Sequence, residues 1–220
     1  MGFDFVFANL NRRLKMDGRE LLAQVPDKAT KCVFFDPQYR GVLDKMNYGN
    51  EGKSRGIERS ALPQMDEDTI KEFLVQIERV LAPNGYLFLW IDKFHLLDGS
   101  MTAWIKELHS LAIVDMVVWD KQKIGMGYRT RRRCEYCVIV QKEPRKAKST
   151  WQIHNLADVW LEKLTNKAHT HSKPVVLQKQ LILAVTNKND LVIDPCAGGF
   201  SVLEACMLTD RNFLGCDLLG

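Results

Sequence analysis

The segment 192–204 places the tightest constraint on the fold of this chain. It reads Val-Ile-Asp-Pro-Cys-Ala-Gly-Gly-Phe-Ser-Val-Leu-Glu, an apolar run with an acidic end, then a glycine turn and a second apolar run. This order predicts a buried strand that ends at Asp194. It also predicts a turn whose glycines let a ligand approach the backbone, and a helix start with free N–H groups.

Asp217 follows the next predicted strand, where a carboxylate can accept hydrogen bonds from both hydroxyls of a ribose. We therefore predict that an adenosine-containing cofactor binds at the carboxyl ends of parallel strands. The glycines lack the GxGxxG spacing of dinucleotide folds, and no Lys-Ser/Thr follows them as in a phosphate loop. A nucleotide-dependent dehydrogenase is therefore a weak rival, and a helix-capping glycine turn without a ligand is the simpler alternative.

The rest of the chain alternates strand and helix patterns, which predicts an α/β sheet in one domain of 220 residues. The predicted strands are 13–16, 32–35, 86–91, 113–119, 135–141, 191–193 and 212–216. The predicted helices are 17–24, 66–81, 101–110, 174–186 and 200–208. Segment 41–63 is polar and rich in glycine, and we expect it to be a long mobile loop.

A second acidic strand end is Asp36, within Val-Phe-Phe-Asp-Pro-Gln-Tyr at 33–39. Pro37 restricts Asp36 to extended geometry, and Tyr39 places an aromatic ring three residues after the carboxylate. Taken alone, this pattern is weak evidence, because Asp-Pro turns are common.

Together these motifs resemble the amino-methyltransferases of DNA, the N6-adenine and N4-cytosine family, in its permuted β order, and are similar to cell-cycle-regulated and phage adenine enzymes. The matching motifs are Met-Asp-Gly-Arg-Glu-Leu-Leu at 16–22, Asp-Pro-Gln-Tyr at 36–39, Val-Val-Trp-Asp-Lys at 117–121, His-Ser-Lys-Pro at 171–174, Asp-Pro-Cys-Ala-Gly-Gly at 194–199, and Asp217. The resemblance covers nearly the whole chain. It implies a Rossmann-like methyltransferase fold with a mixed, mostly parallel seven-stranded sheet and helices on both faces.

The resemblance also implies methyl transfer from S-adenosylmethionine to the N6 amine of adenine in DNA, without a metal. The catalytic residues would be Asp36, Pro37 and Tyr39. The cofactor-binding residues would be Asp17, Ser172, Lys173, Asp194, Pro195, Gly198, Gly199 and Asp217. The family pattern puts Asp194, Gly198 and Gly199 around the methionine and ribose, and Asp217 at the ribose hydroxyls. It puts Asp17 near the adenine, and Ser172 with Lys173 near the methionine carboxylate. The alternative for Ser172 and Lys173 is a purely structural role, in which Pro174 begins a helix and Ser172 caps it.

Gln38 departs from the family, which has a second proline at this position and so a more rigid motif. Because of this departure, other functional hypotheses remain. The chain could be an N4-cytosine or RNA adenine methyltransferase, or a catalytically weak nucleic-acid-binding module on the same fold. An aspartate at the first motif position favours adenine, because serine is common there in the cytosine branch.

The formal net charge of +4 conceals an uneven distribution. Residues 121–148 carry +8, so the rest of the chain carries −4, a pattern typical of a phosphate-binding strip. The expected nucleic-acid contacts are Lys123, Arg129, Arg131, Arg132 and Arg133. A solvated loop with an excess of basic residues is the alternative.

Chain length and cysteine usage limit the possible sequence specificity, cellular location and metal content of the protein. The only candidate target-recognition insertion is 143–170, so we expect recognition of a short or relaxed sequence, which a homodimer would assist.

No signal peptide or membrane span is evident, and six scattered cysteines form no disulfide framework, so we expect a cytoplasmic protein associated with DNA. Cys134 and Cys137 form a CxxC without a second ligand pair, which disfavours a zinc site.

Overall fold

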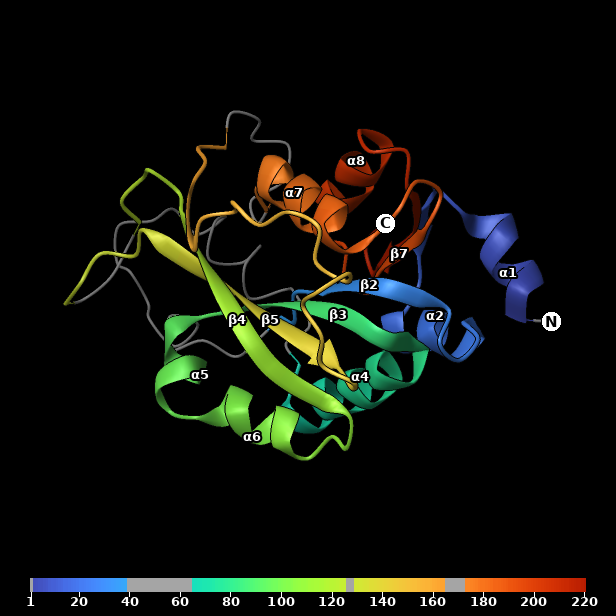
Figure 1. Cartoon of the computed structure of the whole chain (residues 1–220). Coiled ribbons are helices and arrows are strands. Elements are labelled where there is room, and N and C mark those ends of the chain that lie inside the picture. Colours follow the sequence, from blue (N-terminus) through green and yellow to red (C-terminus); the bar gives the residue numbers. More distant parts are fainter. Residues whose placement is uncertain (1, 39–64, 126–128, 165–172) are drawn as a thin grey trace.

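The computed structural model describes residues 2–38, 65–125, 129–164 and 173–220. Within these ranges an eight-stranded sheet runs through the molecule in the order β1-β8-β7-β2-β3-β5-β4-β6 (Figure 1). The strands are β1 (Arg13–Lys15), β2 (Thr30–Phe35), β3 (Leu81–Ile91), β4 (Leu111–Asp120), β5 (Cys134–Lys142), β6 (Val159–Leu161), β7 (Leu191–Asp194) and β8 (Asn212–Asp217). Neighbouring strands are parallel, except that β5 pairs antiparallel with both β3 and β4.

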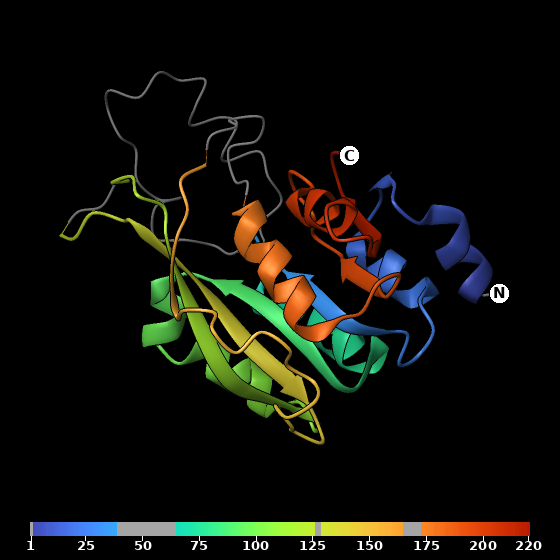
Figure 2. The ribbon, with the colours of Figure 1, turned by 45° about the horizontal axis from the view of Figure 1, so that its top comes forward.

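Helices cover both faces of this sheet (Figure 2). They are α1 (Gly2–Asn9), α2 (Gly18–Gln24), α4 (Glu67–Val80), α5 (Lys93–Leu97), α6 (Ser100–Lys106), α7 (Val175–Val185) and α8 (Ser201–Met207). Helices α4, α5 and α6 lie on one face, and α7 and α8 lie on the other (Figure 2). The predicted α/β class, with a mixed and mostly parallel sheet covered on both sides, is confirmed.

Two apolar cores lie on the two sides of the sheet. On β2, Val33 and Phe35 belong to the core under α4, whereas Cys32 and Phe34 belong to the core under α7 and α8. All four side chains are at most 1% exposed. A strand segment covered on both faces needs apolar residues at successive positions, which explains why residues 32–35 of β2 show no polar alternation.

Helix α4 confirms the helix expected from apolar periodicity. The Asp66 carboxylate accepts a hydrogen bond of 2.8 Å from the Thr69 N–H and so caps the first turn. The inward face then buries five side chains: Ile70, Phe73, Leu74, Ile77 and Val80.

The predicted strand count of seven is one too low, and the predicted start of one strand is wrong. The additional strand is β6, three residues that pair with β4 inside the expected insertion 143–170. Strand β3 begins at Leu81 rather than Tyr86, because its pairing with β2 continues through an irregularity where Asn84 adopts a φ of 61°. Three-residue strands and left-handed kinks leave little periodic signal.

The topology creates a crevice at the carboxyl ends of β2 and β7. From β2 the chain passes through α4 to β3, and from β7 it passes through α8 to β8. These two connections run away from each other and along opposite faces of the sheet (Figure 2). Such a switch point leaves open space for a ligand above neighbouring strand ends.

Some predicted features lie outside the described residues, namely the loop 41–63 and the last part of the insertion 143–170. Of the insertion's described part, Trp151 packs edge-on against Tyr86, with ring centroids 5.6 Å apart. None of the described helices has the length and apolar character that crossing a bilayer requires.

Candidate active site and cofactor pocket

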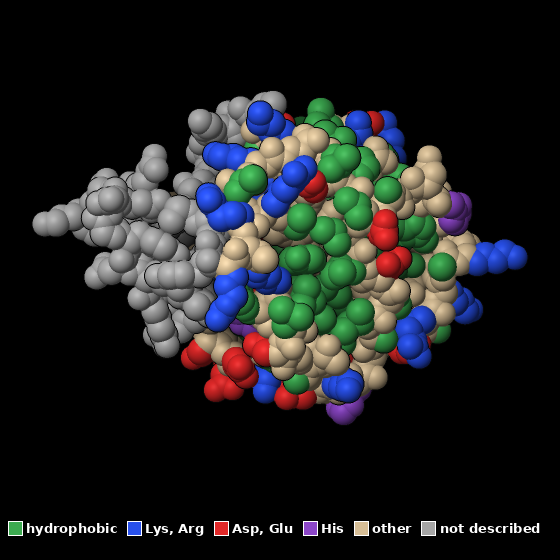
Figure 3. Space-filling model, turned by 90° about the vertical axis from the view of Figure 1, so that its left-hand side faces the viewer, with side chains coloured by type: hydrophobic (Ala, Val, Ile, Leu, Met, Phe, Trp, Pro, Cys, Tyr) green, Lys and Arg blue, Asp and Glu red, His purple; other side chains and the backbone are tan. Residues whose placement is uncertain are grey.

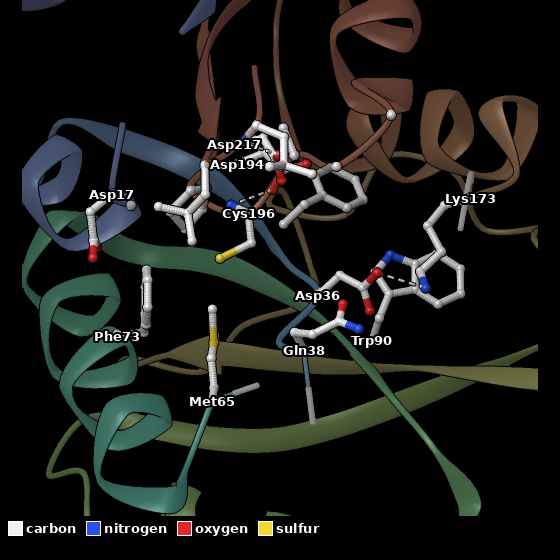
Figure 4. A pocket seen from close by; sticks show the side chains of 18 of the residues that line it. Asp17, Asp36, Gln38, Met65, Phe73, Trp90, Lys173, Asp194, Cys196 and Asp217 are labelled. Carbon is white, nitrogen blue, oxygen red and sulfur yellow. Dashed lines mark hydrogen bonds and ion pairs between the residues drawn. The ribbon is translucent and has the colours of Figure 1, made fainter. Parts of the chain in front are cut away.

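A cavity of about 310 Å³ occupies the switch point, and the predicted aspartates meet in it. Asp36, Asp194 and Asp217 enter from the carboxyl ends of β2, β7 and β8 (Figure 4). The predicted site residues that line the cavity are Asp17, Asp36, Lys173, Asp194, Pro195, Gly198, Gly199 and Asp217. Five separate segments of the sequence therefore contribute to one pocket.

Three further predicted residues are not part of this lining. Pro37 is buried behind Asp36. Tyr39 and Ser172 lie outside the described residues, so their expected roles stay predictions.

Asp194 is a buried carboxyl group at the base of the cavity, with 5% of its surface exposed. It accepts a hydrogen bond of 3.2 Å from the Cys196 N–H. The pKa of Asp194 is raised to about 8, mainly by burial and also by the nearby carboxylates of Asp36 and Asp217. The hydrogen bond from Cys196 and the charge of Lys173 oppose this rise only in part. A positively charged ligand beside Asp194 would lower this pKa by favouring the ionised carboxylate.

The glycine turn lies in the lining of the cavity, with both Gly198 and Gly199. Gly198 has a φ of 48°, a left-handed conformation that suits glycine. The turn is tied to β8 by a hydrogen bond of 2.9 Å from the Ala197 N–H to the Cys216 carbonyl. Beyond it, Asp217 accepts the Leu219 N–H at 2.9 Å, so its carboxylate has a defined orientation at the cavity rim.

The start of α2 closes the cavity on the opposite side. Asp17 caps α2 by accepting the Arg19 N–H at 2.8 Å, and it also binds the Arg19 guanidinium at 2.9 Å. These hydrogen bonds lower the pKa of Asp17. A Cβ on Gly18 would lie 2.2 Å from the Pro195 carbonyl oxygen, so only glycine allows α2 to approach the cofactor motif this closely.

Asp36 forms part of a chain of alternating charges. The Lys173 ammonium lies 2.7 Å from Asp36 Oδ2 and 3.1 Å from Glu135 Oε2, and Lys121 lies 3.1 Å from Glu135 Oε1. Figure 4 shows the Asp36 carboxylate directed at Lys173 beside the Trp90 ring, whose centroid is 5.3 Å from the ammonium.

The pKa values follow from these contacts. Burial opposes ionisation of Glu135, but Lys173 and Lys121 outweigh it and hold its pKa at about 2. Burial likewise disfavours the charge on Lys173, whereas Asp36 and Glu135 favour it more strongly and raise its pKa. Lys173 is therefore a cation and Glu135 an anion at neutral pH.

Sequence reasoning missed several cavity walls, above all Phe73 on α4 together with Met65. The periodicity of α4 marked Phe73 only as a core residue, and no motif includes Met65. Trp90, expected in the core, is both 2% exposed and part of the cavity lining. The contact between Glu135 and Lys173 also has no local signal, because the two residues are 38 positions apart.

The predicted basic segment lies between β4 and β5, at the same edge of the sheet as the cavity. Arg133 Nε binds Asp120 at 2.6 Å, and Arg131 Nε binds the Gly125 carbonyl at 2.7 Å. Arg132 lies over the Phe94 ring, while Lys123 and Arg129 are exposed. In Figure 3, Lys and Arg side chains gather beside the grey residues on this side of the molecule.

The cavity suits a cofactor that joins a flat ring to a cationic group. Phe73 and Met65 supply apolar walls, and among the described residues no Lys or Arg forms an ion pair with the buried carboxyl of Asp194. In the described part of the chain, no cluster of three or more His, Cys, Asp or Glu side chains has the geometry of a metal site. The six cysteines are free thiols, and burial raises the pKa of Cys137 within the CxxC.

The sheet order, the switch-point cavity and the paired acidic strand ends define a class, the Rossmann-like methyltransferases in permuted order. A family described as DNA methylase matches residues 30–219, and the chain belongs to this family. The chain is 63% identical over 210 residues to Type II methyltransferase M.HhaII of Haemophilus parahaemolyticus, covering 96% of this chain and 92% of that protein.

Solved structures agree on the fold. The M1.HpyAVI complex with S-adenosylmethionine superposes with a TM-score of 0.66 at 16% identity, over 94% of this chain and 92% of the other. The cytosine-N4-specific PvuII DNA methyltransferase superposes with a TM-score of 0.71 at 14% identity, over 94% and 81%. The chain is therefore a DNA methyltransferase that uses S-adenosylmethionine.

Proposed function

We propose that this enzyme methylates the exocyclic N6 amine of adenine in DNA. The observation that carries the proposal is the position of Asp36, whose carboxylate lines the same cavity as Asp194 and Asp217. S-adenosylmethionine supplies an activated methyl group there. A group that binds the accepting amine must lie within reach of that donor, and the place of Asp36 in the lining of the same cavity supports this role.

The chemistry of the amine explains why a carboxylate is needed. The lone pair of an exocyclic amine is delocalised into the ring, so the nitrogen is a weak nucleophile. Asp36 and the Pro37 carbonyl can accept hydrogen bonds from its two N–H groups and so favour a tetrahedral, reactive nitrogen. Tyr39 would stack on the base and align it for in-line attack.

An aspartate at position 36 favours adenine over cytosine, because serine is common there in enzymes that methylate cytosine N4. Gln38 replaces the second proline of the family motif, and its backbone carbonyl accepts the Met65 N–H at 2.8 Å. This hydrogen bond restrains the backbone at Gln38, where the family motif has the more rigid proline. The N4-cytosine and RNA activities are outcomes that product analysis separates from the proposed one.

We assign the cofactor along the cavity as follows. Asp217 binds the ribose hydroxyls, Asp17 lies near the adenine, and the turn of Asp194, Pro195, Gly198 and Gly199 surrounds the methionine and ribose. The whole chain acts as a single methyltransferase domain.

DNA would be held by the segment between β4 and β5, where Lys123 and Arg129 are exposed. The target base is paired in the duplex, so it must flip into the cavity at a cost of a few kcal/mol. The short insertion 143–170 supports recognition of a short or relaxed sequence, which a homodimer would assist. Mapping of methylated sites on a plasmid tests this point, and methylation confined to a motif of about six or more base pairs would contradict it.

Replacement of Asp36 tests the proposal. Asp36→Ala should lower the single-turnover rate of methyl transfer to DNA by about a hundredfold or more, the loss typical of a removed transition-state contact. Binding of S-adenosylmethionine should change little. Asp210→Ala is the control, since Asp210 pairs with Lys188 on the surface, with 67% of its side chain exposed. A variant Asp36→Ala that keeps the wild-type rate would refute the proposal.

A further inference from the structure

We propose that Glu135 is a positioning residue of the methyl-transfer site, which holds Lys173 against Asp36 and offsets the charge of that lysine. This role rests on the proposed transfer to an amine at Asp36. It also gives Lys173 a different function from the binding of the methionine carboxylate that the sequence motif suggests.

The geometry shows why Lys173 has this role. Its ammonium is bound by two carboxylates, Asp36 at 2.7 Å and Glu135 at 3.1 Å, and only 13% of the side chain is exposed. The Trp90 ring lies on another side of the ammonium. An ammonium with these three neighbours is already well satisfied, and a methionine carboxylate would have to compete with both acids for it.

Glu135 reaches the site because β5 is the reversed strand of the sheet. Strand β5 runs antiparallel to β3, so its first residues lie beside the carboxyl end of β3, where Ile91 pairs with Tyr136. Glu135 is thus brought to the edge where Asp36 and Lys173 meet. Lys121 binds its second oxygen at 3.1 Å and fixes its orientation.

The charge balance gives Glu135 its effect on the reaction. Methyl transfer breaks the bond between sulfur and carbon and forms a bond between nitrogen and carbon. The positive charge moves from the sulfur to the amine nitrogen, which then releases a proton to solvent. The positive charge of Lys173 beside Asp36 would repel this developing charge. The negative charge of Glu135 offsets that of Lys173, so the carboxylate of Asp36 can still stabilise the amine nitrogen as it becomes positive.

Glu135→Gln removes the charge and keeps the shape. We expect the single-turnover rate to fall about tenfold, the size expected when one partly exposed charge is lost a few Å from a reacting centre. The affinity for S-adenosylmethionine should stay within about twofold, since the charge acts on the transfer rather than on cofactor binding. Glu135→Asp, which keeps the charge, should recover most of the rate and serves as the second variant if Glu135→Gln is unstable.

A readout independent of activity is the acylation rate of Lys173 in the cofactor-free protein, measured by mass spectrometry after limited treatment with an amine-reactive anhydride. Loss of one of its two carboxylate partners should raise that rate several-fold in Glu135→Gln. Glu107→Gln is the matched control, because Glu107 forms an ion pair of 3.0 Å with Lys71 and does not line the cavity. It should change neither Lys173 labelling nor the transfer rate.

The outcomes separate this inference from the proposed function. If wild-type enzyme transfers methyl groups to DNA and Glu135→Gln matches its rate, the role of Glu135 is wrong and the proposed function stands. The role is equally wrong if the rate falls only in proportion to lost cofactor affinity, or if Lys173 labelling is unchanged. No transfer by the wild-type enzyme to any DNA would overturn both.

Discussion

Asp194 should make the cofactor-free enzyme less stable as the pH rises, and Asp194→Asn should remove this dependence. The carboxyl group has a pKa of about 8 in the folded protein, against 3.8 when it is unperturbed. The folded state therefore keeps a proton that the unfolded state releases. A raised pKa of this kind contributes stability fully below pH 3.8, and that contribution is lost as the pH rises towards 8.

The magnitude follows from the two pKa values. Each pH unit between them costs about 1.4 kcal/mol of unfolding free energy, so the loss between pH 5 and pH 9 is about 4 kcal/mol. Asparagine has nearly the same shape and does not titrate. Its side-chain oxygen can still accept the Cys196 N–H, which Asp194 accepts at 3.2 Å.

Urea unfolding of both proteins at pH 5, 7 and 9, without cofactor, measures this difference. The unfolding free energy of Asp194→Asn relative to wild type should increase steadily with pH. Asp210→Asn is the control, because Asp210 is a surface residue paired with Lys188 and should show no such trend. A difference between Asp194→Asn and wild type that stays constant within about 0.5 kcal/mol from pH 5 to 9 would refute the reasoning.

Two further predictions concern ligands. Because Asp194 must lose its proton to face a cationic donor, the affinity for S-adenosylmethionine should weaken by up to about tenfold per pH unit below pH 8. Calorimetry at pH 6, 7 and 8 checks this, and a pH-independent affinity would contradict it. For DNA, Arg129→Gln combined with Lys123→Gln should reduce the salt dependence of binding by about two charges. Fluorescence anisotropy over a range of salt concentrations measures this slope, and an unchanged slope would place the DNA elsewhere.

The positions of three aspartates that line the cavity could be predicted, because each follows a buried apolar run. Asp36, Asp194 and Asp217 all stand at the ends of parallel strands, and such ends meet at one edge of a sheet whatever the intervening loops do. Recognition of the three strand ends was therefore enough to predict that these carboxylates lie at one edge of the sheet.

The partners of Asp36 could not be predicted, because they depend on the direction of one strand. Glu135 reaches the site only because β5 is antiparallel to its neighbours, and the apolar run of β5 carries no sign of its direction. Lys173 matched a motif, but its binding to two carboxylates follows from tertiary structure alone.

Short elements were missed for a different reason. Helix α5 has five residues and β6 has three, which is too few for apolar periodicity to be recognised. Each depends on a local contact: Asp92 caps α5 by accepting the Phe94 N–H at 2.9 Å, and β6 pairs with the longer strand β4.

Identification of the methylated nucleoside tests the central claim most directly. Unmethylated DNA is incubated with the enzyme and S-adenosylmethionine carrying an isotopic label in its methyl group, then digested to nucleosides and analysed by mass spectrometry. The label should appear in N6-methyladenine with wild-type enzyme, and at the same early time point Asp36→Ala should give about a hundredfold less of it or lower still. Label in N4-methylcytosine, or equal labelling by Asp36→Ala, would contradict the role assigned to this site.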